Sequence, residues 1–164
     1  MTYLKFTIGI FVILAVSRLI PHPPNFTSLL ALSFYIPAIF GRKFIPSIML
    51  SFLLTDLIIG FHNTTFFTWG SVLVIGLISK FFSNKIFLRL LGAIFGAVIF
   101  FIITNFGVWI VGGYEANIHG LFTSYTMAIP FFTYSLLSTV FFSILIEVVI
   151  KVGKNYRTKY NFNF

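Results

Sequence analysis

Six long apolar segments, separated by short polar or basic breaks, are the feature that most constrains this chain. They cover residues 3–20, 26–40, 44–61, 66–82, 86–111 and 121–152. A helix needs about 20 residues to cross a bilayer, and most of these segments approach or exceed that length. In lipid the backbone must satisfy its own hydrogen bonds, and these segments lack the alternation of polar and apolar residues typical of barrel strands. The sequence therefore predicts an all-α membrane protein, a bundle of six transmembrane helices.

The composition excludes a soluble domain. Hydrophobic residues make up 59% of the 164 residues and charged residues only 9%, and the mean hydropathy is +1.04. A water-soluble domain needs about a quarter of its residues charged. We expect one transmembrane domain over residues 1–152 and a basic, frayed cytoplasmic tail over residues 153–164.

The basic residues predict the orientation. The net charge is +8, and with six spans all Lys and Arg residues except Arg18 fall on one side. These residues are Lys5, Arg42, Lys43, Lys80, Lys85, Arg89, Lys151, Lys154, Arg157 and Lys159. Because positive residues stay on the cytoplasmic side, we expect both termini in the cytoplasm and the chain in the bacterial inner membrane. The charges stand singly or in pairs at segment ends, which indicates topology signals and no nucleic-acid partner.

An alternative for the first segment is a signal peptide, since Lys5 precedes an apolar run ending at Ala15-Val16-Ser17. Residues 21–25 have the composition of a short turn between helices, which favours a retained first helix.

A buried acid marks the outer end of the bundle. Asp56 lies about one and a half turns inside the third segment, where an ionised carboxylate costs ~2.5–3.5 kcal/mol on insertion scales. It therefore needs a partner or a wet cavity, and Arg18 comes from the adjacent helix at similar depth. The pair either binds a ligand or only locks two helices. For Arg18 there is a further alternative, in which its side chain extends to the lipid headgroups on the outer side of the membrane.

Other polar residues gather on the same side. His22 and Asn25 lie in the turn after the first segment, and His62 follows the third. Asn105 and Trp109 are one helical turn apart in the fifth segment, so that an amide and an indole face share one side of the helix. Such a pair can hold a planar polar ligand; the alternative is an interfacial Trp belt with Asn105 bonded to a neighbouring helix. We predict substrate binding by Arg18, His22, Asn25, Asp56, His62, Asn105 and Trp109.

Enzyme motifs are missing from the sequence. It contains no cysteine, no phosphate-binding P-loop, no Gly-x-Ser-x-Gly and no His-Glu-x-x-His. We therefore expect neither catalysis nor a cofactor, and we assign no metal ligands. Three histidines and two outward-facing acids keep a metal-ion transporter as an alternative.

Three smaller features predict packing. Gly92 and Gly96, with alanines beside each, allow another helix to approach closely, which we interpret as packing inside the bundle; the alternative is a surface for a partner subunit. Pro46 fits the first turn of the third helix, and Pro130 is expected to kink the sixth. Glu147 is expected to pair with Lys151 four residues later.

Three motifs carry a family resemblance. They are residues 17–27 (SRLIPHPPNFT), residues 55–62 (TDLIIGFH) and residues 128–132 (AIPFF). Through them nearly the whole chain resembles a family of small, uncharacterised bacterial membrane proteins, and that family is similar to the S-components of energy-coupling-factor (ECF) transporters. The motif positions that carry over are Arg18, His22, Asn25, Asp56 and His62.

The resemblance implies a six-helix protein that captures a vitamin or a precursor near its outer face. Two ATPases and a scaffold subunit would then drive release inside by toppling of the bundle. Many S-components meet the scaffold through an alanine-rich first helix, whereas this one has only Gly9 and Ala15 as scattered small residues. We expect a transport protein; the second hypothesis is an assembly subunit of a larger membrane complex.

Overall fold

The computed structural model describes residues 2–82 and 85–160, and the regular secondary structure of this part of the chain is all helical, with no strand. The elements are α1 (Thr2–Leu19), α2 (Leu29–Phe40), η1 (Arg42–Phe44), α3 (Ile45–Ile59), α4 (Thr65–Ile78), η2 (Ser79–Phe82), α5 (Ile86–Ile110) and α6 (Ile118–Tyr160). The all-α prediction is confirmed, and the six α-helices coincide closely with the six apolar segments.

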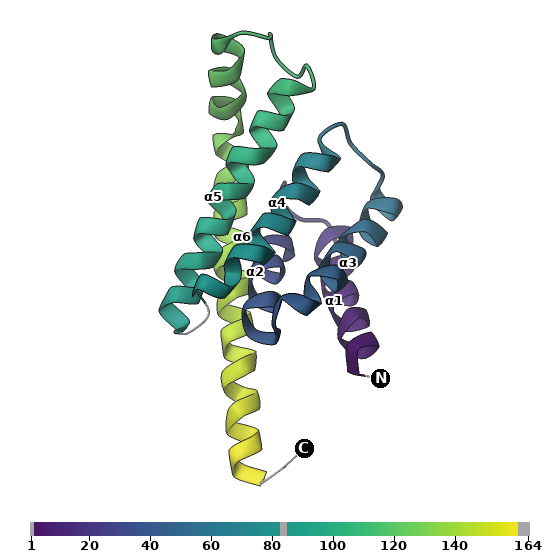
Figure 1. Cartoon of the computed structure of the whole chain (residues 1–164), viewed down its shortest axis with the longest axis vertical. Coiled ribbons are helices and arrows are strands. Elements are labelled where there is room, and N and C mark those ends of the chain that lie inside the picture. Colours follow the sequence, from purple (N-terminus) through teal and green to yellow (C-terminus); the bar gives the residue numbers. More distant parts are fainter. Residues whose placement is uncertain (1, 83–84, 161–164) are drawn as a thin grey trace.

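The helices alternate in direction, so their connections gather at two ends (Figure 1). The α3–α4 and α5–α6 connections lie towards the upper end of the view, and the start of α1 and the end of α6 lie at the lower end. Helices α5 and α6 form a long hairpin, and α1 packs on α3. Helix α2 contacts α3, α4, α5 and α6, so this short apolar helix is the centre of the bundle.

Glycines end two of the helices for a steric reason. Gly41 after α2 and Gly60 after α3 have φ angles of 93° and 105°, a region that side chains with a Cβ rarely adopt. The Gly60 amide donates to the carbonyl oxygen of Asp56 at 2.8 Å, which closes the last turn of α3. Pro46 lies in the first turn of α3, as predicted.

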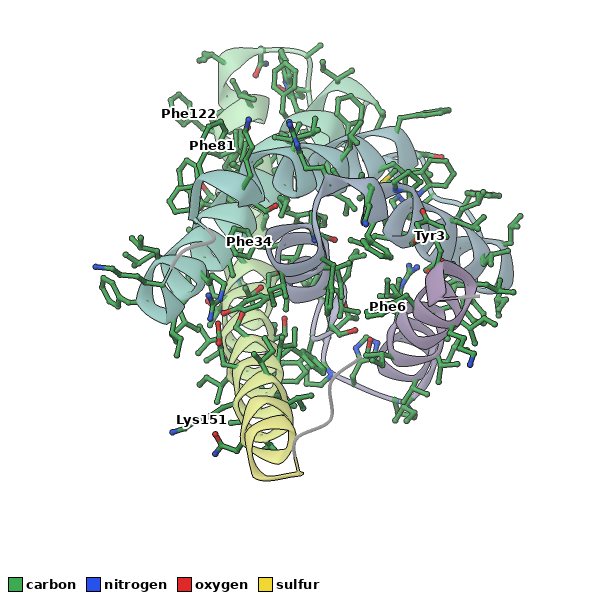
Figure 2. All side chains as sticks on the ribbon, turned by 60° about the horizontal axis from the view of Figure 1, so that its bottom comes forward. Tyr3, Phe6, Phe34, Phe81, Phe122 and Lys151 are labelled. Carbon is green, nitrogen blue, oxygen red and sulfur yellow. The ribbon has the colours of Figure 1, made fainter. Side chains whose placement is uncertain are left out.

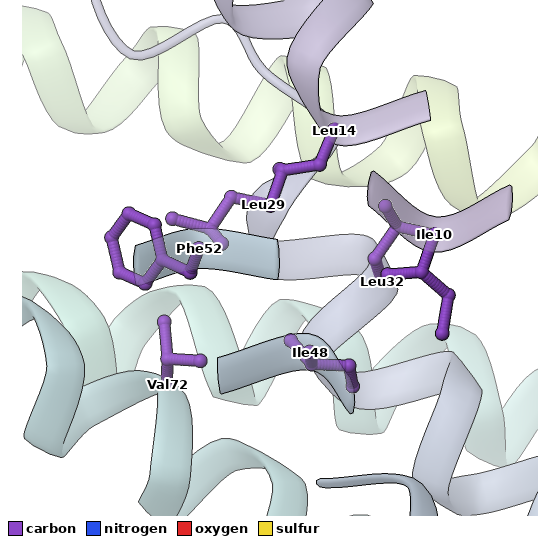
Figure 3. Close-up of a cluster of buried hydrophobic side chains, with 7 residues drawn as sticks. All are labelled: Ile10, Leu14, Leu29, Leu32, Ile48, Phe52 and Val72. Carbon is purple, nitrogen blue, oxygen red and sulfur yellow. The ribbon is translucent and has the colours of Figure 1, made fainter. Parts of the chain in front are cut away.

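Two buried clusters join the helices. In the first, side chains from α1, α2, α3 and α4 converge (Figure 3). It consists of Ile10, Leu14, Leu29, Leu32, Ile48, Phe52 and Val72. The second joins α2 to α4 and α5 and consists of Leu30, Phe34, Tyr35, Ile75, Ala93 and Ala97. Because α2 contributes to both clusters, it connects the α1–α3 pair to the α5–α6 hairpin.

The small residues of α5 allow this contact. A Cβ added to Gly92 would collide with the Phe34 ring of α2 and lie 2.7 Å from the Phe82 Cβ, and one added to Gly96 would lie 3.1 Å from Ile75 Cγ2 of α4. Gly92 and Gly96 are buried within the bundle. The prediction of intra-bundle packing is therefore confirmed.

The distribution of polarity is the reverse of that in a soluble protein. Large apolar side chains are exposed, among them Phe66 at 82% and Phe81 at 70%, whereas many serines and threonines are buried. Figure 2 shows Phe122 at the periphery and Phe34 inside the bundle. Small polar residues at helix contacts and apolar residues outside are typical of membrane bundles.

Within the described residues, three helical stretches are long and apolar enough to cross a membrane: Thr65–Phe82, Ile86–Ile110 and Ile118–Gly153. With the exposed apolar surface, they fit an α-helical membrane protein.

The sixth helix departs from expectation in two ways. It continues past Val152 to Tyr160, where the sequence indicates a frayed tail, and residues 161–164 lie outside the described part. Pro130 lies inside the helix, and the kink expected there stays a prediction. Glu147 pairs with Arg89 of α5 through two hydrogen bonds of 2.7 Å each, not with Lys151 as predicted. The flat guanidinium matches both carboxylate oxygens, which a lysine ammonium cannot do.

Candidate functional site

A buried carboxylate lies at the centre of the candidate site. Asp56, in the last turn of α3, is 1% exposed. Its Oδ1 lies 2.6 Å from Nη1 of Arg18 at the end of α1. Its Oδ2 accepts a hydrogen bond of 2.7 Å from Nε1 of Trp69 in α4. The expected Arg18–Asp56 pair is therefore present, and Trp69 adds a third helix to it.

Arg18 is held on one side only. Its Nη1, besides the ion pair, donates to the Thr55 hydroxyl, and its guanidinium carbon lies 4.8 Å above the centre of the Phe52 ring. Within residues 2–82 and 85–160, Nε and Nη2 have no hydrogen-bond acceptor. The side chain is 14% exposed and contributes to the wall of a cavity.

Two adjoining cavities lie beside this pair. The Arg18 chamber has a volume of about 250 Å³ and is lined by Arg18, His22, Asn25, Thr27, Leu29, Leu30, Phe52, Ile59, His62, Thr68, Phe100 and Ser135. The Asn105 chamber has a volume of about 280 Å³ and is lined by Asn25, His62, Thr64, Thr68, Phe100, Phe101, Thr104, Asn105, Val108, Ala128, Phe131, Phe132 and Ser135. The shared residues are Asn25, His62, Thr68, Phe100 and Ser135, so the chambers form one divided space. All six α-helices contribute to the Arg18 chamber.

The turn between α1 and α2 closes one side of this space. His22 Nδ1 lies 2.7 Å from the Pro23 carbonyl oxygen, and Nε2 lies 3.3 Å from the Arg18 carbonyl oxygen. Asn25 has a φ of 62°, in the left-handed region that asparagine tolerates. Its carbonyl oxygen accepts a hydrogen bond from the Ser138 hydroxyl at 3.4 Å, which ties the turn to α6.

His62 lies between the two chambers. Its Nδ1 is 2.9 Å from the Thr64 hydroxyl, and its backbone amide donates to Thr65 Oγ1. These contacts fix the ring on the α3–α4 connection. Nε2 has no partner in the described part of the chain, so a ligand can use it.

The Asn105 chamber has aromatic walls. Phe101 and Phe132 both line it and pack directly against each other, with ring centres 4.5 Å apart and an interplanar angle of 32°. Asn105 donates from Nδ2 to the Phe101 carbonyl oxygen at 2.7 Å, and no donor in the described residues reaches its Oδ1. A polar acceptor beside aromatic faces suits a planar ligand.

Two predicted residues lie outside the walls. Asp56 lies behind Arg18 and lines neither chamber. Trp109 lines neither chamber, and its Nε1 donates to the Glu115 carbonyl oxygen at 3.0 Å in the α5–α6 connection. The structure thus brings Arg18, His22, Asn25, His62 and Asn105 to one space and leaves Trp109 apart.

The sequence patterns did not indicate three residues of the site. Thr68 and Ser135 line both chambers, and Trp69 bonds to Asp56. Thr64 and Thr68 are four residues apart at the start of the fourth segment, a spacing that places both on one helix face. Ser135 begins a run with Thr139 and Ser143 at the same spacing. Both patterns could have indicated helix faces that point inward.

The residue types that line the two chambers indicate which kind of ligand they can bind. Both chambers together are lined by one arginine and two histidines, with no aspartate or glutamate among the described lining residues. Among the described residues, no three His, Cys, Asp or Glu side chains lie together as a metal site would need. The arrangement suits a small organic solute better than a metal ion.

Comparison with known proteins gives one match. No curated protein and no solved structure matches the chain. A family of unknown function matches over residues 2–159, nearly the whole chain, and the chain therefore belongs to the DUF6580 family.

Proposed function

We propose that this protein is a substrate-binding integral membrane protein that captures a small solute at its outer face for uptake. The observation that carries the proposal is the divided space formed by the Arg18 and Asn105 chambers. All six α-helices line its first chamber, and the polar residues of two connections reach into it. A bundle used only as a scaffold has no need for such a space.

The proposal includes the topology. Six spans place both termini in the cytoplasm and the two chambers near the outer face of a bacterial inner membrane. The alternating helices support this, as do the basic residues Lys5, Arg42, Lys43, Lys85 and Lys151 in the segments opposite the chambers.

The solute is proposed to be a vitamin or a related micronutrient, on the basis of the resemblance to ECF S-components. Coupling to a scaffold subunit and two ATPases belongs to the same proposal. The surface of α1 that faces away from the bundle carries large side chains such as Ile8, Val12 and Val16, each about half exposed. The scaffold would therefore have to bind a bulky apolar face.

Native mass spectrometry of the protein purified gently from its own host tests the proposal. We expect a bound small molecule that is lost in His62→Ala, since His62 lines both chambers. Phe122→Ala, at an exposed position away from the chambers, is the matched control and should keep the molecule. A protein that carries no solute, together with unchanged solute uptake by cells carrying His62→Ala, would refute the proposal.

The alternative is an assembly subunit of a membrane complex. The observation in its favour is that Asp56 has protein partners on two other helices, Arg18 and Trp69, so the network can lock the bundle without a ligand. Stable co-purification with other membrane proteins, unaffected by His62→Ala, would favour this function.

A further inference from the structure

We propose that the solute is an anion: a molecule with a carboxylate or phosphate head and a planar apolar body. This inference rests on the proposed solute-binding function and names its substrate class. The head would bind Arg18, and the body would occupy the Asn105 chamber.

The first argument is the geometry of Arg18. A guanidinium has five N–H donors in one plane, and two parallel donors can bind both oxygens of a carboxylate or phosphate. Asp56 and Thr55 both contact Nη1. The opposite edge, Nε and Nη2, has no acceptor among the described residues, although the side chain lines a chamber. A bidentate edge is thus left to a ligand.

The second argument is the position of the charges. Asp56 neutralises Arg18 from behind, and at 1% exposure it has no surface in the chamber. The positive end of the pair therefore faces the ligand, and the negative end is enclosed by protein. This orientation stabilises the buried arginine while no ligand is bound, and it presents only donors to the ligand.

The third argument is the histidine at the junction of the two chambers. The ring nitrogens of His22 face the carbonyl oxygens of Pro23 and Arg18, whereas the His62 ring is held by Thr64 through Nδ1 alone. His62 Nε2 is open to the ligand. With no acid in the described lining of either chamber, a cationic ligand would meet no counter-charge. An anion meets the Nε and Nη2 donors of Arg18 and, in the tautomer with its proton on Nε2, the His62 ring as a third donor.

The adjoining chamber defines the rest of the molecule. Phe101 and Phe132 supply aromatic faces, and Asn105 supplies one amide oxygen. Since His62 and Phe100 line both chambers, one ligand can span them. The head would lie near Arg18 and a ring near Phe132.

The test uses two probes of nearly equal shape, benzoate and benzamide. Each is titrated in the millimolar range by isothermal titration calorimetry into the purified full chain in detergent, after removal of any co-purified solute. We expect benzoate to bind about tenfold more tightly than benzamide, because a charge-assisted bidentate contact exceeds a neutral one by roughly that factor. Inorganic phosphate, as a third probe, should compete with benzoate and shows whether the head alone is recognised.

Variants test the role of Arg18. Arg18→Gln combined with Asp56→Asn replaces a charged pair by a neutral one and leaves no buried charge alone, so it should fold, as checked by gel filtration and thermal unfolding. We expect the preference for benzoate to disappear. The matched control is Phe122→Ala, at an exposed position that lines neither chamber, which should keep the preference.

The outcomes separate this inference from the proposed function. Equal binding of benzoate and benzamide, or a co-purified solute that is neutral or cationic, would overturn the inference that the solute is an anion. The proposal that the protein binds a small solute would still stand. If neither benzoate nor phosphate binds the unmodified protein, the inference that the solute is an anion would also be overturned. A benzoate preference that persists in the Arg18→Gln/Asp56→Asn variant would overturn the assignment to the Arg18 edge.

Discussion

Replacing Arg18 by methionine should destabilise this protein more than replacing Asp56 by asparagine. Arg18→Met leaves the Asp56 carboxyl group at 1% exposure without its cationic partner, and the Trp69 indole is then its one remaining donor among the described residues. Removing one partner of a buried ion pair typically costs about 3–5 kcal/mol. Asp56→Asn leaves the charge on Arg18, whose side chain is 14% exposed and borders a chamber. Because water can solvate this charge, the loss in free energy of unfolding should be about 1–2 kcal/mol smaller than for Arg18→Met.

The double variant Arg18→Met/Asp56→Asn removes both charges. Because neither charge is then left alone, its cost should be smaller than that of Arg18→Met, with a coupling free energy of about 1–3 kcal/mol. The assay is equilibrium unfolding of the four proteins in mixed micelles, followed by the far-ultraviolet circular dichroism. Additive costs, or a larger loss for Asp56→Asn than for Arg18→Met, would refute the described geometry.

Three further predictions test the packing. Trp69→Phe removes a single donor to the buried carboxylate and should lower the free energy of unfolding by about 1.5–3 kcal/mol, measured in the same micelles; no change would contradict the indole contact. Gly92→Leu should prevent folding, visible as loss of the monodisperse peak in gel filtration, since even a Cβ there would lie 2.7 Å from the Phe82 Cβ. Arg89→Lys should lower the melting temperature, since one ammonium cannot replace both hydrogen bonds to Glu147; an unchanged value would show that the second bond is dispensable.

Hydropathy was sufficient to predict where the helices lie, because the apolar character of a segment depends only on its own residues. Segment 86–111 and helix α5 (Ile86–Ile110) differ by a single residue, and Gly60 ends α3 next to the predicted boundary. Pro46 and the Gly92–Gly96 spacing were also interpreted correctly, since both depend on steric rules within one helix or at one contact.

Side-chain partners were less predictable. Glu147 has a candidate four residues away in Lys151, but it pairs with Arg89, which is 58 residues away. Trp69 was missed because an indole N–H gives no sequence signal for the acceptor it finds on another helix. Asn105 and Trp109 share a helix face in the pattern, yet Asn105 lines a chamber and Trp109 bonds to the α5–α6 connection.

Apolar segment lengths and the positions of basic residues are sufficient to indicate a helical membrane protein with its unusual polar residues near one end. These properties follow from the transfer of each segment into lipid and need no knowledge of its neighbours. The divided chamber, the one-sided support of Arg18 and the burial of Asp56 behind it depend on how six helices cross around α2. That arrangement arises from contacts between residues distant in the chain, and only the tertiary structure decides it.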